Sequence, residues 1–239
     1  MTISISLTWS AGVTDWESEV FSRAVHQILH WLFFRHPDSF FDPPIRVETF
    51  GNWEIPAIAG REPHWGTQWY VDSSYDRELR RVIAPVYLEL VRRAPWQETA
   101  PHLDLTLLDE DLTDFPAPMA RQRPDHYSLG TSYPGQAAVM SVFRLRLLAE
   151  DLARARALTR LVYHHLGHIL AIPPFGRKER VRRRGLEMHC TNRCAMRHPQ
   201  TVAQLLAYID DEAGMGWPFC PECTSALHSV IIAQSGNWN

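Results

Sequence analysis

The sequence His164-His165-Leu166-Gly167-His168, followed by His189-Cys190, Cys194 and Cys220-Pro221-Glu222-Cys223, predicts metal binding in the last third of this chain. Histidines four positions apart lie on one face of a helix, about 6 Å from each other, which suits two ligands of one metal ion. His189 would complete a three-nitrogen site with one coordination position left for water. The alternative for the helical pair is a hydrogen-bonded cluster that stabilises the negative end of the helix dipole.

All 4 cysteines of the chain belong to this stretch. Cys190-x-x-x-Cys194 and Cys220-x-x-Cys223 are compatible with two disulfides, but two closely spaced pairs favour one tetrahedral zinc. A closed four-thiolate site has no open position, so its expected role is to tether the C-terminal segment. Because His189 and Cys190 are neighbours, loss of this metal should also disturb the histidine site.

The composition is that of an ordinary folded domain. The chain has 239 residues, of which 45% are hydrophobic and 21% charged, which suits one globular domain or one domain plus a small appendage. The order of elements and motifs along the chain favours a single domain over 1–239, with an N-terminal part (1–145) and a metal-binding part (146–239). The net charge of -3 argues against nucleic acid as a partner. We find no apolar run of membrane-spanning length and no signal-peptide pattern, so we expect a cytosolic protein with reduced thiols.

Hydrophobic periodicity predicts an α+β fold class. The expected strands are 2–8, 45–50, 102–108 and 137–145, the expected helices are 16–34, 77–93, 146–172 and 201–212, and 117–128 is expected to be a loop. Thr14 is a candidate N-cap for the first helix. Pro85 is expected to kink the second helix, and Pro173-Pro174 to end the third.

The metal-binding motifs resemble those of the archaemetzincins, a family of zinc-dependent peptidases. The resemblance extends from about His102 onward and includes, more weakly, 103–105, 129–130 and 138–145. It implies a metzincin-like mixed twisted sheet with an active-site helix and a zinc-knotted helical C-terminal segment. It also implies two zinc ions and a peptide or protein as the ligand. By resemblance, the catalytic zinc ligands are His164, His168 and His189, the structural zinc ligands are Cys190, Cys194, Cys220 and Cys223, and the methionine packed beneath the first zinc is Met196.

The chain departs from the family pattern at the position of the catalytic glutamate, where it has His165. It also inserts 173–184 before the third histidine, and Ala171 stands where the family has a glycine. Gly185 and His189 restore the pattern with one residue more between them than usual. We therefore expect peptide hydrolysis to be impaired or lost. The alternatives are an inactive zinc-dependent peptide-binding or scaffold protein, and a non-peptidase hydrolase that uses the same metal.

Three further features leave alternatives open. His165 could act as a weak base or bind the metal itself, and Glu187 or Glu179 could supply a carboxylate in its place. The arginine-rich run 177–184 is expected to be a solvated loop, although a basic wall that attracts acidic peptides, or less readily a nucleic-acid contact, would also use it. The tryptophans that either line a cleft or fill the core are Trp53, Trp65, Trp69 and Trp217.

Overall fold

A five-stranded mixed sheet forms the centre of the computed structural model, which describes residues 3–35, 45–53 and 66–235. The strand order across this sheet is β2 (Ile45–Gly51), β1 (Ile3–Trp9), β5 (Leu103–Leu108), β8 (Ala137–Ser141) and β7 (Gly130–Tyr133). The first four strands pair in parallel and β7 runs antiparallel to β8. β7 is therefore an edge strand of the sheet.

Helices cover both faces of the sheet. On one face, α1 (Asp15–Arg35) and α6 (Asp151–Ile169) pack on alternate strand residues such as Ile5, Leu7 and Leu105 in the main hydrophobic core. On the other face, α2 (Thr67–Ser74) and α3 (Ala84–Arg92) pack in a second core with Val139. Because side chains alternate across a strand, residues one step along β1 and β5 face the second layer.

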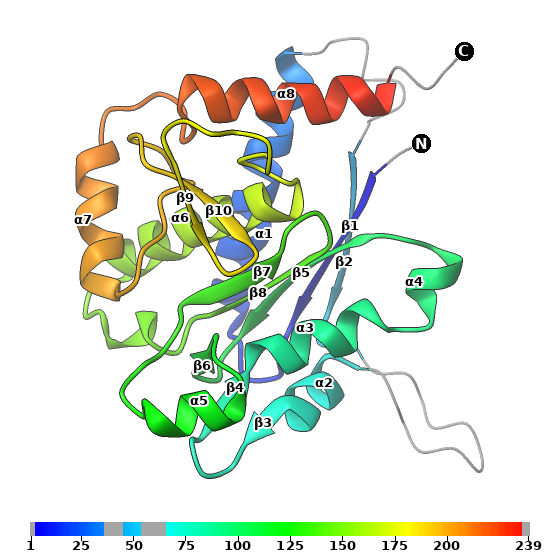
Figure 1. The fold of residues 1–239 in the computed structure, drawn as a ribbon, viewed down its shortest axis with the longest axis vertical. Coiled ribbons are helices and arrows are strands. Elements are labelled where there is room, and N and C mark those ends of the chain that lie inside the picture. Colours follow the sequence, from blue (N-terminus) through cyan, green and yellow to red (C-terminus); the bar gives the residue numbers. More distant parts are fainter. Residues whose placement is uncertain (1–2, 36–44, 54–65, 236–239) are drawn as a thin grey trace.

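Shorter elements surround these layers (Figure 1). A three-stranded sheet joins β3 (Tyr75–Asp76), β4 (Arg81–Ile83) and β6 (Leu112–Thr113), and α4 (Trp96–Thr99) and α5 (Ala117–Gln122) are single short helices. A hairpin of β9 (Val181–Arg184) and β10 (Glu187–Cys190) is followed by α7 (Val202–Glu212) and α8 (Pro221–Ser235). In Figure 1 this C-terminal group, coloured yellow to red, lies on the opposite side of the sheet from α2 and α3.

The start of α1 confirms the predicted cap. The Thr14 hydroxyl accepts a hydrogen bond from the Glu17 backbone N–H at 3.3 Å, and the Glu17 carboxylate accepts one from the Thr14 N–H at 2.9 Å. This reciprocal pair satisfies two donors at the helix start. Arg146 also donates to Glu17 at 2.8 Å, which joins α1 to the segment that leads into α6.

Several predicted boundaries were wrong. The expected helix 77–93 is confined to α3, and β3 and β4 precede it. Pro85 does not kink this helix but lies in its first turn, where no backbone N–H is needed. The expected strand 137–145 ends at Ser141 and gives way to a 3₁₀ turn at Leu145–Leu147. The expected helix 146–172 is shortened at both ends, and the expected loop 117–128 contains α5.

The predicted α+β class with a mixed sheet is confirmed. In the described ranges, none of the helices has the length and apolarity needed to cross a lipid bilayer. Of the tryptophans expected to line a cleft or fill the core, Trp217 stacks on Trp31 with ring centroids 3.5 Å apart, whereas Trp53 and Trp69 pack at the second core. Trp65 lies outside the described residues.

Candidate metal centre

Helix α6 carries the first two predicted ligands on its buried face. His164 and His168 are each 1% exposed, and their Nε2 atoms lie 3.2 Å apart. Two nitrogens that are each 2.0–2.1 Å from a tetrahedral zinc are separated by about 3.3 Å, so this spacing fits a shared ion. One ligand atom from each of His164, His168 and His189 lies within 4.8 Å of the others. The structure thus brings the predicted three histidines together.

A backbone carbonyl orients the first histidine. The Nδ1 atom of His164 lies 2.9 Å from the Ala195 carbonyl oxygen, an acceptor, so Nδ1 carries the proton and Nε2 keeps its lone pair. Arg160 of α6 fixes the same turn, since it donates to the Cys194 carbonyl at 3.2 Å and pairs with Glu212 at 3.0 Å. The turn that holds Ala195 is therefore anchored to the helix that carries the ligands.

The methionine of this turn packs against α6 at its glycine. Met196 is fully buried, and a Cβ placed on Gly167 would overlap its Sδ atom. Gly167 is therefore needed because it leaves room for the Met196 side chain against α6. Met196 therefore packs against the turn of α6 that lies between His164 and His168.

We expect Gly167→Ala to destabilise the protein by about 1–3 kcal/mol, because the new methyl group overpacks against Met196. The better helix propensity of alanine, about 1 kcal/mol, offsets only part of this cost. Denaturant unfolding measures the difference. Gly176→Ala is the control, since a Cβ there meets nothing within 4 Å. A Gly167→Ala variant as stable as the wild type would contradict the packing argument.

The third histidine arrives on the β9–β10 hairpin. The arginine-rich run, expected to be a solvated loop, is in part β9, and Arg182 pairs with His189 across the hairpin. Ala171 has a φ of 57°, so it adopts the left-handed conformation that a glycine would favour. The inserted residues thus fold into a structure that carries His189 back to α6.

Buried polar atoms around His189 lack partners. His189 is 3% exposed, and neither its Nδ1 nor its Nε2 has a hydrogen-bond partner among the described residues. A buried imidazole without a partner is costly unless a ligand satisfies it. The unsatisfied ring nitrogens of His189 and the two neighbouring imidazoles fit a cation, and three imidazoles suit zinc.

Burial keeps five neighbouring imidazoles neutral, namely those of the three candidate ligands and of His165 and His198 beside them. It is the first cause of the low pKa at each ring, and repulsion between neighbouring rings or from Arg184 adds to it. The pKa values of His164 and His168 lie well below 6.5, that of His189 is lowered to about 4, and those of His165 and His198 to about 3. Neutral imidazoles have the lone pairs that a metal requires.

His165, in the position of the missing glutamate, faces strand β7. Its Nδ1 atom lies 2.9 Å from the Ser132 hydroxyl, and a Cβ on Gly130 would overlap its Nε2. The ring is 2% exposed. Both nitrogens are therefore directed at the edge strand, and Gly130 provides the space for the ring.

A buried carboxyl group lies beside His189. Glu187 is 5% exposed, its Oε2 lies 3.4 Å from His189 Nε2, and its Oε1 has no hydrogen-bond partner among the described residues. Burial raises the pKa of Glu187 to about 8, against the opposing effect of hydrogen bonds from Ser132. Of the two glutamates that could supply a carboxylate, the hairpin therefore places Glu187 beside the three histidines.

His198 was missed by the sequence reasoning. It forms a second group with Glu187 and His189, whose ligand atoms lie within 4.8 Å of one another. However, Arg184 donates a hydrogen bond to His198 Nε2 at 2.5 Å, so that nitrogen already uses its lone pair. Because the other ring nitrogen then carries the proton, the three-histidine group is the better cation site. The only available signal was a histidine two residues after Met196.

The four predicted cysteines meet in one buried cluster. Their sulfur atoms lie within 4.8 Å of one another, and all four are free thiols. Arg177, from the insertion, donates to Cys223 Sγ at 3.3 Å and to Cys190 Sγ at 3.6 Å. Hydrogen bonding within the cluster, first from Cys194, holds the pKa of Cys190 below its usual range. A cation beside four thiolates offsets part of their charge, which suits a structural zinc.

Comparison with known proteins shows the fold. Searches with family models and against curated proteins match nothing. Among solved structures, the chain is similar to archaemetzincin from Methanopyrus kandleri, with a TM-score of 0.59 and 19% sequence identity over 97% of this chain and 96% of that one. The predicted resemblance to archaemetzincins is thereby confirmed for the fold, including the sheet, the α6 helix and the C-terminal cysteine segment.

Proposed function

We propose that this chain, which has the archaemetzincin fold, is a zinc-binding protein of the metallopeptidase type in which peptide hydrolysis is impaired. The observation that carries the proposal is the buried group of His164, His168 and His189, in which neither ring nitrogen of His189 has a hydrogen-bond partner among the described residues. These three histidines would hold a zinc ion, which would supply a Lewis acid for carbonyl groups and water. The second zinc of the proposal is held by the four cysteines.

The orientation of His165 supports the impairment. A general base must lie about 2.6–3.2 Å from the proton that it accepts. The nearest partner of His165 is Ser132 on β7, at 2.9 Å, and the other side of the ring faces Gly130. His165 is therefore held by the edge strand and does not present a free nitrogen to the three histidines. It fills the space of a catalytic carboxylate without supplying one.

The proposed partner is a peptide in extended form. β7 is the last strand of the central sheet, and in the described part of the chain no further strand pairs with its outer edge, which is the kind of edge to which an extended peptide adds. The same strand carries Ser132 and Gly130, which contact His165 beside the histidine site. A peptide on this edge would lie next to the metal. A cytosolic location belongs to the same proposal, since it would keep the four thiols reduced.

Native mass spectrometry of the full chain, purified with zinc, tests the proposal. We expect two zinc ions per wild-type chain and one in a His189→Ala variant. His26→Ala is the matched control, because His26 is exposed on α1, and it should keep two ions. One ion in the wild type, or two ions in His189→Ala, would overturn the three-histidine site and with it the peptidase type.

A further inference from the structure

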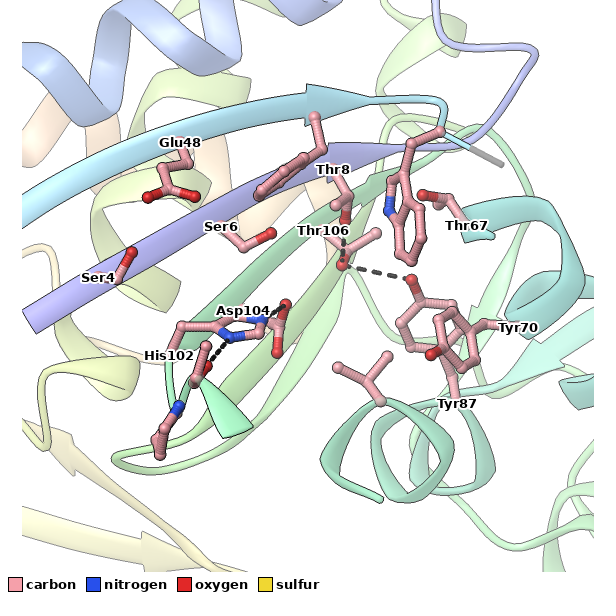
Figure 2. A pocket seen from close by; sticks show the side chains of 15 residues that line it. Ser4, Ser6, Thr8, Glu48, Thr67, Tyr70, Tyr87, His102, Asp104 and Thr106 are labelled. Atoms are coloured by element: carbon pink, nitrogen blue, oxygen red, sulfur yellow. Dashed lines mark hydrogen bonds and ion pairs between the residues drawn. The ribbon is translucent and has the colours of Figure 1, made fainter. Parts of the chain in front are cut away.

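A pocket of about 530 Å³ lies between β1, β2, β5, α2 and α3, on the face of the central sheet away from the histidines (Figure 2). The polar side chains on its floor pair with one another. Thr8 and Thr106 hydrogen-bond at 2.9 Å. Asp104 accepts a hydrogen bond from Gln97 at 2.7 Å and lies 3.3 Å from His102. These groups are satisfied without a ligand, whereas the β9–β10 hairpin contains a charged side chain that is not.

One face of the β9–β10 hairpin is turned toward the candidate metal centre. Cross-strand partners leave a pair of antiparallel strands on the same face, and Arg182 is the partner of His189 while Arg184 is the partner of Glu187. The other contacts of this face agree with its direction. Arg184 donates to His198 Nε2 at 2.5 Å, and Glu187 Oε2 lies 3.4 Å from His189 Nε2. Arg182 therefore lies on the metal-facing side of the hairpin.

The guanidinium of Arg182 has no partner. Arg182 is exposed and makes no hydrogen bond or ion pair among the described residues. The other arginines of the run 177–184 do have partners there, which are cysteine sulfurs, carboxylates, a ring nitrogen or backbone carbonyls; they are Arg177, Arg180, Arg183 and Arg184. The hairpin thus uses its other arginines to hold its structure and leaves one guanidinium free to bind a ligand.

Arg182 stands at the rim of the centre. His189 is 3% exposed, whereas Arg182 beside it is exposed, so the two side chains extend from the buried histidine to solvent. The Cβ atoms of cross-strand neighbours are about 4.5–5.5 Å apart, so an arginine side chain can reach a group bound next to the imidazole. The same hairpin face contacts β7, because Glu187 accepts hydrogen bonds from Ser132. It therefore extends from the proposed peptide edge past His189 to Arg182.

We propose that Arg182 binds a carboxylate of the peptide that occupies the histidine centre, so that the favoured ligands are acidic peptides. This inference rests on the proposed function and adds the chemical class of the ligand. The carboxylate belongs to the C-terminus of the peptide or to an acidic side chain, and both offer the same two oxygens. A guanidinium matches them with two parallel hydrogen bonds, which supply orientation as well as affinity.

Arg183 provides the matched control. It is the next residue along β9 and is equally exposed, but it points to the opposite face of the hairpin. General attraction of an anion by the basic run would involve Arg182 and Arg183 alike. A carboxylate site on the metal-facing side involves Arg182 alone. Arg182→Gln and Arg183→Gln remove the same charge one residue apart and therefore separate the two explanations.

Isothermal titration of the zinc-loaded full chain with paired probes tests the proposal. Acetohydroxamate, a zinc chelator, measures access to the metal. The monohydroxamates of succinic, glutaric and adipic acid add a carboxylate at increasing distance, and their monoamides are the neutral counterparts. In the wild type, we expect at least one acid to bind about tenfold more tightly than its amide. This preference should disappear in Arg182→Gln and persist in Arg183→Gln.

Two further measurements separate a carboxylate contact from a structural effect. Native mass spectrometry of Arg182→Gln should give the same zinc count as the wild type, which shows that His189 is still in place. Arg182→Lys keeps the charge but not the paired hydrogen bonds, so it should retain only part of the preference.

Peptides identify the source of the carboxylate. The probes are an acetylated hexa-alanine with a free C-terminus, its C-terminal amide, and amides with a single glutamate at each position. Tighter binding of the free acid assigns the C-terminal carboxylate, and tighter binding of a glutamate peptide assigns a side chain. Either result supports the proposal when the gain is lost in Arg182→Gln.

Equal binding of every acid and its amide in the wild type, or an equal loss of preference in Arg183→Gln, overturns the proposal while the metal centre stands. A different result marks failure of the proposed function. If acetohydroxamate does not bind the wild type, or binds His189→Ala just as tightly, the three histidines do not hold an accessible zinc. The carboxylate contact is then overturned together with the metal centre.

Discussion

His165→Glu is expected to raise the peptidase rate of the protein by about 10²–10⁴-fold, the usual contribution of a positioned acid–base group. The substitution restores a carboxylate on the turn of α6 between His164 and His168. The space exists, because Gly130 leaves room beside the present imidazole and a glutamate side chain is no larger. Hydrolysis of a quenched peptide library by the zinc-loaded protein measures the rate.

His165→Gln is the matched control, since it has the shape of glutamate without its charge and should show no gain. Glu187→Gln in the His165→Glu background separates the two carboxylates. If Glu187 already supplies the missing base, Glu187→Gln alone lowers the peptidase rate of the wild-type protein, and His165→Glu raises that rate only a little. Equal rates for His165→Glu and His165→Gln would reject the disabled-peptidase interpretation and favour a peptide-binding protein.

The ligand groups were predictable because they depend on local geometry. Histidines at positions 164 and 168 share a helix face whatever the tertiary structure, and two close cysteine pairs favour one ion. The structure accordingly brings each predicted group within 4.8 Å. The departure at His165 was equally visible in the sequence. Its orientation toward Ser132 was not, because that depends on which strand lies at the sheet edge.

The inserted hairpin shows what the sequence could not decide. Its arginines suggested a solvated loop, but Arg184 and Glu187 pair across a two-residue turn in which Gly185 has a φ of 58°. Glycine at the first turn position is a hairpin signal that was available. The burial of Glu187 was not available, because charge content predicts exposure and only the register of β9 and β10 turns this residue inward.

Polar and apolar residues alternate along β1, and a pattern such as Ser4, Ile5 and Ser6 usually indicates a half-buried strand with one face in water. In the structure α2 and α3 cover that face and leave the pocket between them. The residues 67–74 gave no strong helical periodicity. A polar strand face therefore does not distinguish solvent from a lined pocket.

Cys223→Ser is expected to cost more than one zinc ion. Serine is a poor zinc ligand, so the cysteine site should lose its metal. The free energy of unfolding should fall by more than about 4 kcal/mol as a result. The histidine site should weaken as well, by about 10–100-fold in zinc affinity. The reason is connectivity: Cys190 follows His189 directly, and Cys194 precedes the Ala195 carbonyl that orients His164.

A substitution in the histidine site should leave the cysteine site intact. His164→Asn should remove the histidine-site ion while the cysteine ion stays, because the four sulfur atoms form a closed group without any histidine. Zinc counts by native mass spectrometry, combined with denaturant unfolding of both variants, measure this asymmetry. If the cysteine cluster positions the histidine ligands, Cys223→Ser weakens metal binding at both sites, whereas His164→Asn weakens it at the histidine site alone.

Retention of full zinc affinity at the histidines of Cys223→Ser would show that other contacts hold His189 in place. The structure contains two candidates. The β9–β10 pairing fixes the backbone of His189, and Arg184 ties the hairpin to Asp114 at 3.3 Å. Arg184→Ala in the Cys223→Ser background would then release the ligand. If zinc affinity persisted even there, the positions of His164 and His168 on α6 alone would account for metal binding, and His189 would not be a ligand.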